Sequence, residues 1–173
     1  GALVFASCAS CHMRDGGGRP DGSVPRLAGQ RPDVLEARLL ALAAGAVDLP
    51  VMTPFARSLG ADEVREVAAW LAGLPAPLEI GVGLGDELKR GRIVFAERCA
   101  TCHGAGGEGA AGAPRVCGQH AGYVLRRLDG IALSSRADAN PAMAAIVAPM
   151  EPGLRAAVAD YLSRGDCRPP EAP

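Results

Sequence analysis

The residues of this sequence that are best suited to chemistry lie in two short clusters of cysteine and histidine, at residues 8–12 and 99–103. Both fit Cys-x-x-Cys-His, the attachment signature of c-type haem. Two thiols at this spacing can each form a thioether to one vinyl group, and the next residue places an imidazole beneath the iron. The pattern predicts two covalently attached haem c groups, with His12 and His103 as iron ligands. The four cysteines predicted to carry them are Cys8, Cys11, Cys99 and Cys102.

Three other interpretations of the cysteines are less consistent with the sequence. A structural zinc site would draw both pairs onto one ion, whereas here the pairs are far apart and each is followed by histidine. A thioredoxin-like redox pair requires a βαβ setting, and no such pattern is present. Free or disulfide-bonded cysteines would not explain why the residues around both clusters are also repeated.

Methionine is the side chain expected on the opposite side of each iron, because a sulfur ligand raises the reduction potential and keeps substrates off the metal. Of the four methionines, Met52 and Met143 occupy matching places, each two residues after a proline. Met13 adjoins its own histidine and cannot reach the far side. Met150 is an alternative to Met143, but its counterpart in the first half is Leu59. The ordinary alternative for a methionine in such a stretch is core packing.

The whole chain reads as a tandem repeat. Its second half repeats in order the residues that surround the first cluster, with small changes in loop length. The predicted domains are residues 1–76 and 87–173, joined by a linker rich in proline and glycine at 77–86. The matched positions outside the clusters are Gly1 and Gly91, Phe5 and Phe95, Pro25 to Gln30 and Pro114 to Gln119, and Trp70 and Tyr161.

Helices are the elements that must position these residues. Apolar side chains recur at helical spacing in each half, alternating strand patterns are missing, and glycine-rich stretches read as loops. An all-α fold is predicted, with Asp86 as the N-cap of the helix that leads to Cys99. One mismatch between the two halves is Arg155, which occupies the repeat position of Val64. The helical apolar positions are Leu35, Leu39, Leu42, Val64, Val67, Ala68 and Leu71 in the first half, and Val124, Leu128, Ile131, Val158, Ala159 and Leu162 in the second.

Composition narrows the classes of partner. The formal net charge is −1 and the pI about 6.3, so nothing indicates nucleic-acid binding. No apolar run approaches the ~20 residues that span a bilayer. Lys89 is the only lysine, so a docking ring of lysines is excluded. The chain starts without Met and without the sections of a signal peptide, and we interpret it as a mature or trimmed product.

The combination of Gly-x-x-x-Phe, Cys-x-x-Cys-His, Pro-x-Leu-Ala-Gly-Gln, a late methionine and a closing aromatic helix resembles the class I cytochrome c fold. The tandem arrangement resembles the dihaem cytochrome c4 family over essentially the whole chain. The resemblance implies two mainly helical domains that face each other with haem propionates near the interface, and electron transfer in the periplasm. It also implies that Gly91 and Phe95 cross the helix bearing Tyr161, and that Gly1 and Phe5 cross the helix bearing Trp70.

The expected function is therefore single-electron transfer between redox proteins, without enzymatic activity. The donor would be a dehydrogenase or a respiratory complex, and the acceptor a terminal oxidase or reductase. One alternative is an electron-transfer subunit of a dehydrogenase complex, for example a sulfide-oxidising flavocytochrome. Another is a dihaem enzyme, such as a peroxidase or a thiosulfate-oxidising cytochrome, with one iron left open.

Three features depart from the family pattern. Cys117 and Cys167 lie outside the haem motifs and could form a disulfide or remain thiols, while ligation of iron by Cys117 is disfavoured by its expected place on the histidine side. His120, the one histidine outside the motifs, is expected to be exposed at a helix start. Residues 129–142 make a longer approach to Met143, which predicts a less shielded second haem.

Overall fold

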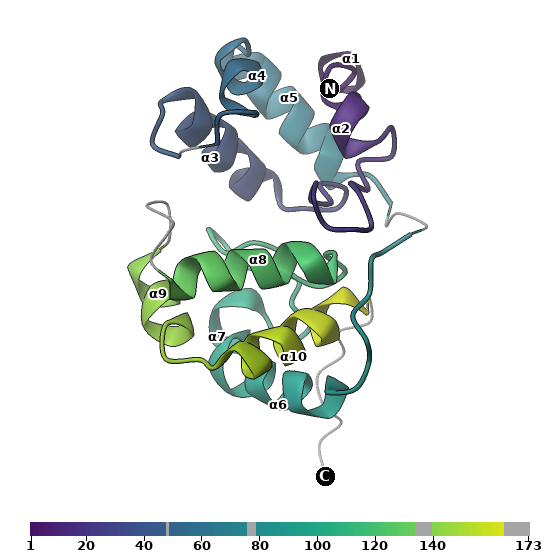
Figure 1. Cartoon of the computed structure of the whole chain (residues 1–173). Coiled ribbons are helices and arrows are strands. Elements are labelled where there is room, and N and C mark those ends of the chain that lie inside the picture. The colour runs from purple at the N-terminus through teal and green to yellow at the C-terminus, as the bar shows by residue number, and fades with distance from the viewer. Residues whose placement is uncertain (48, 76–78, 134–139, 165–173) are drawn as a thin grey trace.

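The computed structural model describes residues 1–47, 49–75, 79–133 and 140–164, and these form two groups of helices stacked end to end (Figure 1). No strand occurs in these ranges, apart from one isolated bridge between Ala110 and Ala113. The first group comprises α1 (Ala2–Phe5), α2 (Ala9–His12), α3 (Pro32–Ala43), α4 (Thr53–Arg57) and α5 (Ala61–Ala72). The second comprises α6 (Leu88–Arg98), α7 (Ala100–His103), α8 (Ala121–Ala132), α9 (Pro141–Val147) and α10 (Pro152–Ser163).

The first and last helices of each half cross closely, as the resemblance implied. In the second half, a Cβ atom on Gly91 would overlap the backbone of Ala157 on α10. Phe95 lies against Tyr161 there, with ring centroids 5.7 Å apart. In the first half Phe5 lies against Trp70 at 4.9 Å. Glycine is required at this crossing because two helix backbones approach each other without room for a side chain.

The interior of the first half consists of two apolar clusters. We call the first the proximal cluster, because the His12 helix adjoins it, and the second the distal cluster, because it contains Met52. Leu39 on α3 contacts both clusters. The buried residues of the proximal cluster are Phe5, Leu35, Val67, Ala68 and Leu71. Those of the distal cluster are Leu42, Val47 and Ala56.

The interior of the second half is one continuous cluster, which we call the C-terminal core. It reaches from Cys99 and Val116 on the histidine side to Met143 on the methionine side. The helical positions predicted from the sequence are buried here. The fully buried members are Val94, Phe95, Cys117, Val124, Leu128, Ile131, Val147, Met150, Val158, Ala159, Tyr161 and Leu162.

Two local expectations change in the second half. The N-cap of α6 is Glu87 and not Asp86, and no side chain caps that end. Arg155, the mismatch in the helical pattern, is buried and forms a 2.6 Å ion pair with Asp129 of α8. Its guanidinium also donates a hydrogen bond to the carbonyl of Met150. A buried guanidinium requires such partners because an unpaired charge is costly inside a protein.

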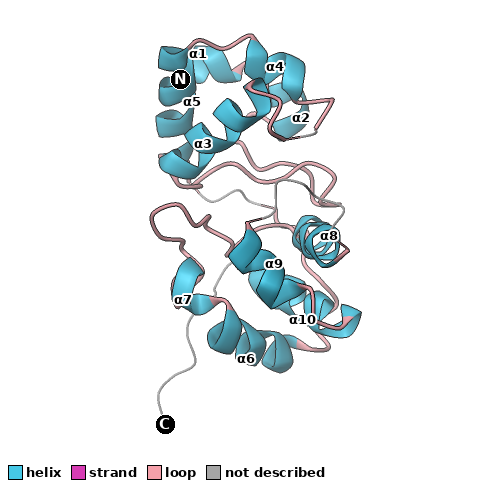
Figure 2. Ribbon diagram, turned by 90° about the vertical axis from the view of Figure 1, so that its left-hand side faces the viewer, coloured by secondary structure: helices cyan, strands magenta, loops and turns pink. Residues whose placement is uncertain are grey.

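Loops from both halves lie between the two helical groups (Figure 2). The segment that leads out of the first half is held on α10, since Gly85 donates a 2.6 Å hydrogen bond to Asp160 and Gly83 a 3.2 Å hydrogen bond to Ser163. The domain limits at residues 76 and 87 stay a prediction. No helix in the described ranges is long and apolar enough to cross a membrane.

Candidate haem-binding sites

Each motif histidine is held in place by the carbonyl of a proline in the repeated loop. Nδ1 of His12 lies 3.1 Å from the Pro25 oxygen, and Nδ1 of His103 lies 2.9 Å from the Pro114 oxygen. A carbonyl can only accept, so Nδ1 carries a proton in both rings, and Nε2 is the ring nitrogen left to bind a metal. This is the arrangement that orients a metal-binding imidazole and fixes its tautomer.

Both rings are largely buried, with exposed fractions of 5% for His12 and 8% for His103. Burial lowers the pKa of His12, with the hydrogen bond to Pro25 as a smaller opposing effect, so this ring stays neutral around pH 7. Within the described ranges, Nε2 of neither ring has a hydrogen-bond partner, and no buried side-chain nitrogen or oxygen lacks one. Both Nε2 atoms are therefore accessible at the surface of the protein chain.

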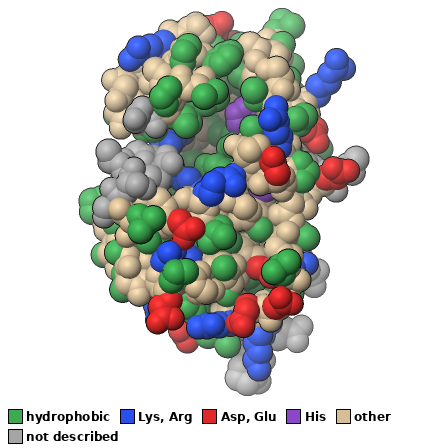
Figure 3. Space-filling model, in the orientation of Figure 1, with side chains coloured by type: hydrophobic (Ala, Val, Ile, Leu, Met, Phe, Trp, Pro, Cys, Tyr) green, Lys and Arg blue, Asp and Glu red, His purple; other side chains and the backbone are tan. Residues whose placement is uncertain are grey.

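A hollow opens on the first half of the molecule, with hydrophobic side chains inside it and a histidine at its edge (Figure 3). Met52 is the residue immediately before α4, at the N-cap position, and it contacts the distal cluster. His12 lies at the end of α2, beside the proximal cluster that includes Cys8 among its partly buried members. The two predicted ligands of the first half thus lie beside different apolar clusters, and an apolar hollow with a histidine at its edge suits an apolar group bound through an imidazole.

The loops that carry the prolines have the same hydrogen bonds in both halves. The carbonyl of Gly16 accepts from the amides of Leu27 and Ala28, and that of Gly107 accepts from Val116 and Cys117. Gly18 and Gly109 donate back to the carbonyls of the motif histidines, at 3.0 and 2.7 Å. Glycine suits these positions because the backbone has positive φ there.

The motif cysteines are suited to covalent attachment. All four are free thiols, three of them partly exposed and Cys102 exposed. Burial raises the pKa of Cys99 to about 11, so its thiol is neutral and is a poor metal ligand. The described residues include no group of three or more potential ligands that could hold a metal ion without a prosthetic group. These observations fit haem attachment and do not favour zinc.

Two methionines lie near the second site. Met143 lies in the first turn of α9 and contacts the C-terminal core from a partly buried position. Met150 is buried within that core, and Arg155 holds its carbonyl. Both have packing partners, so Met143 as the ligand stays a prediction, as does Met52 in the first half. The shielding of the second site also stays open, because residues 134–139 lie outside the described part of the chain.

Cys117 is buried in the C-terminal core and takes part in a disulfide. Cys167, its proposed partner, lies outside the described residues. Because Cys117 is a disulfide sulfur, it is not available as an iron ligand.

His120 does not lie where its sequence position predicts. The prediction of an exposed residue is wrong, because His120 is 0% exposed and lies between the two halves. Its Nδ1 accepts a 3.0 Å hydrogen bond from the amide of Gly81, and its Nε2 donates a 2.8 Å hydrogen bond to the carbonyl of Gly17. Burial lowers its pKa, which keeps the ring neutral as these bonds require.

Gln30 and Gln119 occupy the same place in the two copies, and the sequence predicts no role for either of them. Both join the halves by hydrogen bonds to the backbone of the other copy. A sequence signal was available, because a polar residue repeated at the same place in both copies suits an interface between them.

Comparisons with known proteins agree with this geometry. Residues 88–166 match the family model of Cytochrome c, and residues 1–71 match that of Cytochrome C oxidase, cbb3-type, subunit III. A thiosulfate dehydrogenase electron acceptor of Stutzerimonas stutzeri is 32% identical over 91% of this chain and 78% of its own length. A cytochrome c4 of Thiocapsa roseopersicina is 30% identical over 90% of this chain and 85% of its own. Two other curated relatives are longer, and the chain spans 60% and 59% of their lengths.

The three-dimensional fold is also similar to that of a solved cytochrome c4. The structure of the cytochrome c4 of Acidithiobacillus ferrooxidans superposes with a TM-score of 0.81 at 28% identity, covering 91% of this chain and 98% of that one. The match extends across both helical groups. The chain belongs to the class I cytochromes c, electron-transfer proteins with covalently bound haem, and within them it resembles the dihaem cytochromes c4.

Proposed function

We propose that this chain is a periplasmic cytochrome that carries two haems, one at each candidate site, and transfers single electrons between redox proteins. The observation that carries the proposal is the repetition of one arrangement: a pair of free thiols followed by a buried imidazole whose Nδ1 is bound to a proline carbonyl. The haem iron supplies one-electron redox chemistry when bound. The residues that would attach the two haems are Cys8, Cys11, Cys99 and Cys102.

The chain's own residues would define how each iron behaves. His12 and His103 would be the ligands on one side, with their rings fixed by the carbonyls of Pro25 and Pro114. Met52 and Met143 would be the ligands on the other. A thioether ligand raises the reduction potential and leaves no position for a substrate, which favours an electron carrier over an enzyme.

The second candidate is a dedicated acceptor for a dehydrogenase. It is supported by the relative from Stutzerimonas stutzeri, which is named as an electron acceptor of thiosulfate dehydrogenase. On this hypothesis the donor would be a thiosulfate-oxidising enzyme. Purification under mild conditions separates the two: a stable complex with a dehydrogenase supports the second, and an isolated cytochrome reduced in brief collisions supports the free carrier.

The first experiment is a redox titration followed by absorbance, including the weak near-infrared band of sulfur-ligated ferric haem and a test of carbon monoxide binding. The wild-type protein is expected to show two such haems that do not bind carbon monoxide. Met52→Ala and Met143→Ala should each remove half of the near-infrared band, and Met150→Leu should leave it unchanged. Loss of the band in Met150→Leu, with Met143→Ala unaffected, would reverse the assignment at the second site.

A further inference from the structure

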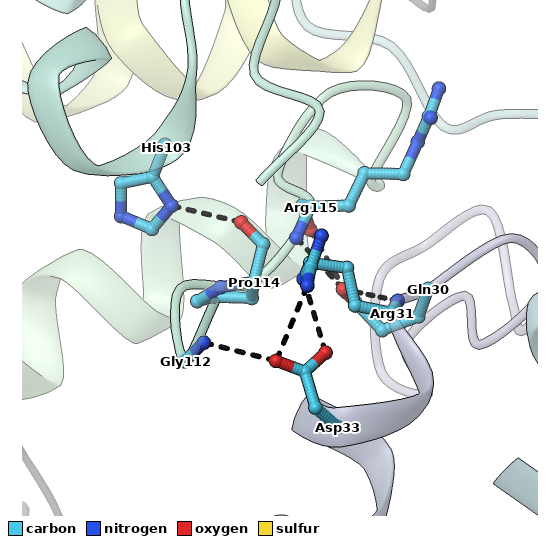
Figure 4. Close-up of polar contacts among 7 residues, drawn as sticks. All are labelled: Gln30, Arg31, Asp33, His103, Gly112, Pro114 and Arg115. Atoms are coloured by element: carbon cyan, nitrogen blue, oxygen red, sulfur yellow. Dashed lines mark hydrogen bonds and ion pairs between the residues drawn. The ribbon is translucent and has the colours of Figure 1, made fainter. Parts of the chain in front are cut away.

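The two halves meet through a reciprocal exchange of hydrogen bonds between equivalent residues. The Arg26 amide donates a 2.9 Å hydrogen bond to Oε1 of Gln119, whose Nε2 donates at 3.0 Å to the Arg26 carbonyl. Gln30 binds Arg115 in the same way, accepting at 2.8 Å and donating at 2.9 Å (Figure 4). Such reciprocity is the pattern of a two-fold interface, here formed by two copies within one chain.

The peptide groups that bind the two glutamines also bind the two motif histidines. The carbonyl of Pro25 and the amide nitrogen of Arg26 belong to one peptide group, which accepts from His12 and donates to Gln119. The peptide group between Pro114 and Arg115 has the same two roles, and Figure 4 shows the chain of contacts from His103 to Gln30. Each histidine is therefore two hydrogen bonds from a glutamine of the other half.

A peptide group is conjugated, so a hydrogen bond at its nitrogen alters the charge on its oxygen. Donation by the Arg26 amide to Gln119 makes the Pro25 oxygen more negative and a better acceptor for Nδ1 of His12. Hydrogen bonds in series strengthen one another, and the effect is larger where water is excluded. Arg26 and Gln119 are both buried, and the pocket between the halves here has a volume of about 10 Å³, room for no more than one water molecule.

We propose that Gln119 and Gln30 are positioning residues that act across the interface, Gln119 on His12 and Gln30 on His103, so that contact between the halves adjusts the reduction potential at each site. The inference rests on the proposed function, in which these histidines are the iron ligands. A stronger hydrogen bond at Nδ1 gives the imidazole more anionic character, which favours the oxidised iron and lowers the potential. Because Arg115 and Gln30 are only partly buried, the effect on the second site is the smaller one.

The test uses the protein with both haems attached and two single variants, Gln119→Met and Gln30→Met, which keep side-chain length but cannot form the hydrogen bonds. Gln119→Met is expected to raise the potential of the first haem more than that of the second, and Gln30→Met should do the opposite. Each potential is assigned to its haem by nuclear magnetic resonance. In the reduced protein, the Nδ1 proton of His12 should exchange with solvent faster in Gln119→Met than in the wild type. That of His103 should exchange faster in Gln30→Met.

Arg126→Met is the matched control, because Arg126 also crosses the interface, to the carbonyl of Gly22, without contacting either peptide group. It should move neither potential. The proposal would be overturned if a glutamine variant shifted mainly the potential of the haem in its own half, or shifted both potentials equally. Either result would indicate a general loosening of the interface. Slow exchange of the Arg26 amide and of the His12 Nδ1 proton in the wild type is a second requirement. If the wild type lacks histidine-methionine spectra, the proposed function fails instead.

Discussion

The two halves of this protein carry the same predicted ligand types, but their interiors are built differently. In the first half, the proximal and distal clusters are joined through Leu39, and the predicted ligands His12 and Met52 lie on different clusters. In the second half, one continuous core extends from Cys99 to Met143. We therefore expect the first half to depend more on its haem, which would fill the space between two small apolar surfaces.

Removing one haem at a time should give the largest effect. In Cys8→Ala/Cys11→Ala the first half is expected to lose most of its helical structure, because neither of its clusters is large enough alone. In Cys99→Ala/Cys102→Ala the second half should keep part of its structure, because its core is continuous. Hydrogen exchange resolved by segment measures both, and each variant is the other's control. Equal loss of protection in both halves would contradict the comparison.

The ion pair between Arg155 and Asp129 is a second difference, since Val64 and Leu40 occupy the equivalent positions in the first half. Asp129→Leu should destabilise the second half by about 2 kcal/mol, because it leaves a buried guanidinium without its carboxylate. The double variant Asp129→Leu/Arg155→Val restores the apolar pair of the first half and should recover most of that loss. Denaturant unfolding of the oxidised protein measures the stability of both variants. A double variant no more stable than Asp129→Leu would argue against the ion pair as the cause of the loss.

The residue after each motif histidine differs in a way that tests backbone strain. Met13 has φ of 62° and ψ of 160°, a conformation adopted almost only by glycine, and Gly104 occupies the equivalent place with φ of 80°. Met13→Gly is therefore expected to stabilise the first half by about 1 kcal/mol, after allowing for the greater freedom of glycine in the unfolded chain. Thermal unfolding measures this, with Gly104→Ala, which should destabilise the second half, as the converse. A destabilised Met13→Gly would show that the methionine side chain matters more than the strain.

The smallest expected effect is on pH dependence, through the buried His120. Burial lowers its pKa in the folded protein below the usual 6.5, opposed by the hydrogen bond to Gly17 and less by Asp21, and Arg26 adds to the lowering. The unfolded chain therefore binds a proton before the folded one does, so stability is complete above pH 6.5 and falls as pH decreases below it. Equilibrium unfolding between pH 7 and pH 5 should show this slope. His120→Gln should reduce the slope, and an unchanged slope would exclude His120 as its source.

Local features of the chain determined much of the site. The cysteine and histidine spacing predicts haem attachment because this chemistry occurs within five consecutive residues. The helices bearing Leu35, Leu42, Val64 and Leu128 could be predicted because apolar side chains at helical spacing must share one face. The crossing of Gly91 with the Tyr161 helix was available only through a family resemblance, and the structure confirms it.

The sequence by itself thus determined the helical fold and the motifs that predict haem attachment, because each depends on residues close together in the chain. Only the tertiary structure decided that Arg155 pairs with Asp129, that His120 is buried and that Gln30 and Gln119 cross between the halves. These contacts join residues distant in sequence, and their energies depend on burial and on which partner lies opposite. Neither property can be obtained from the pattern of a single segment.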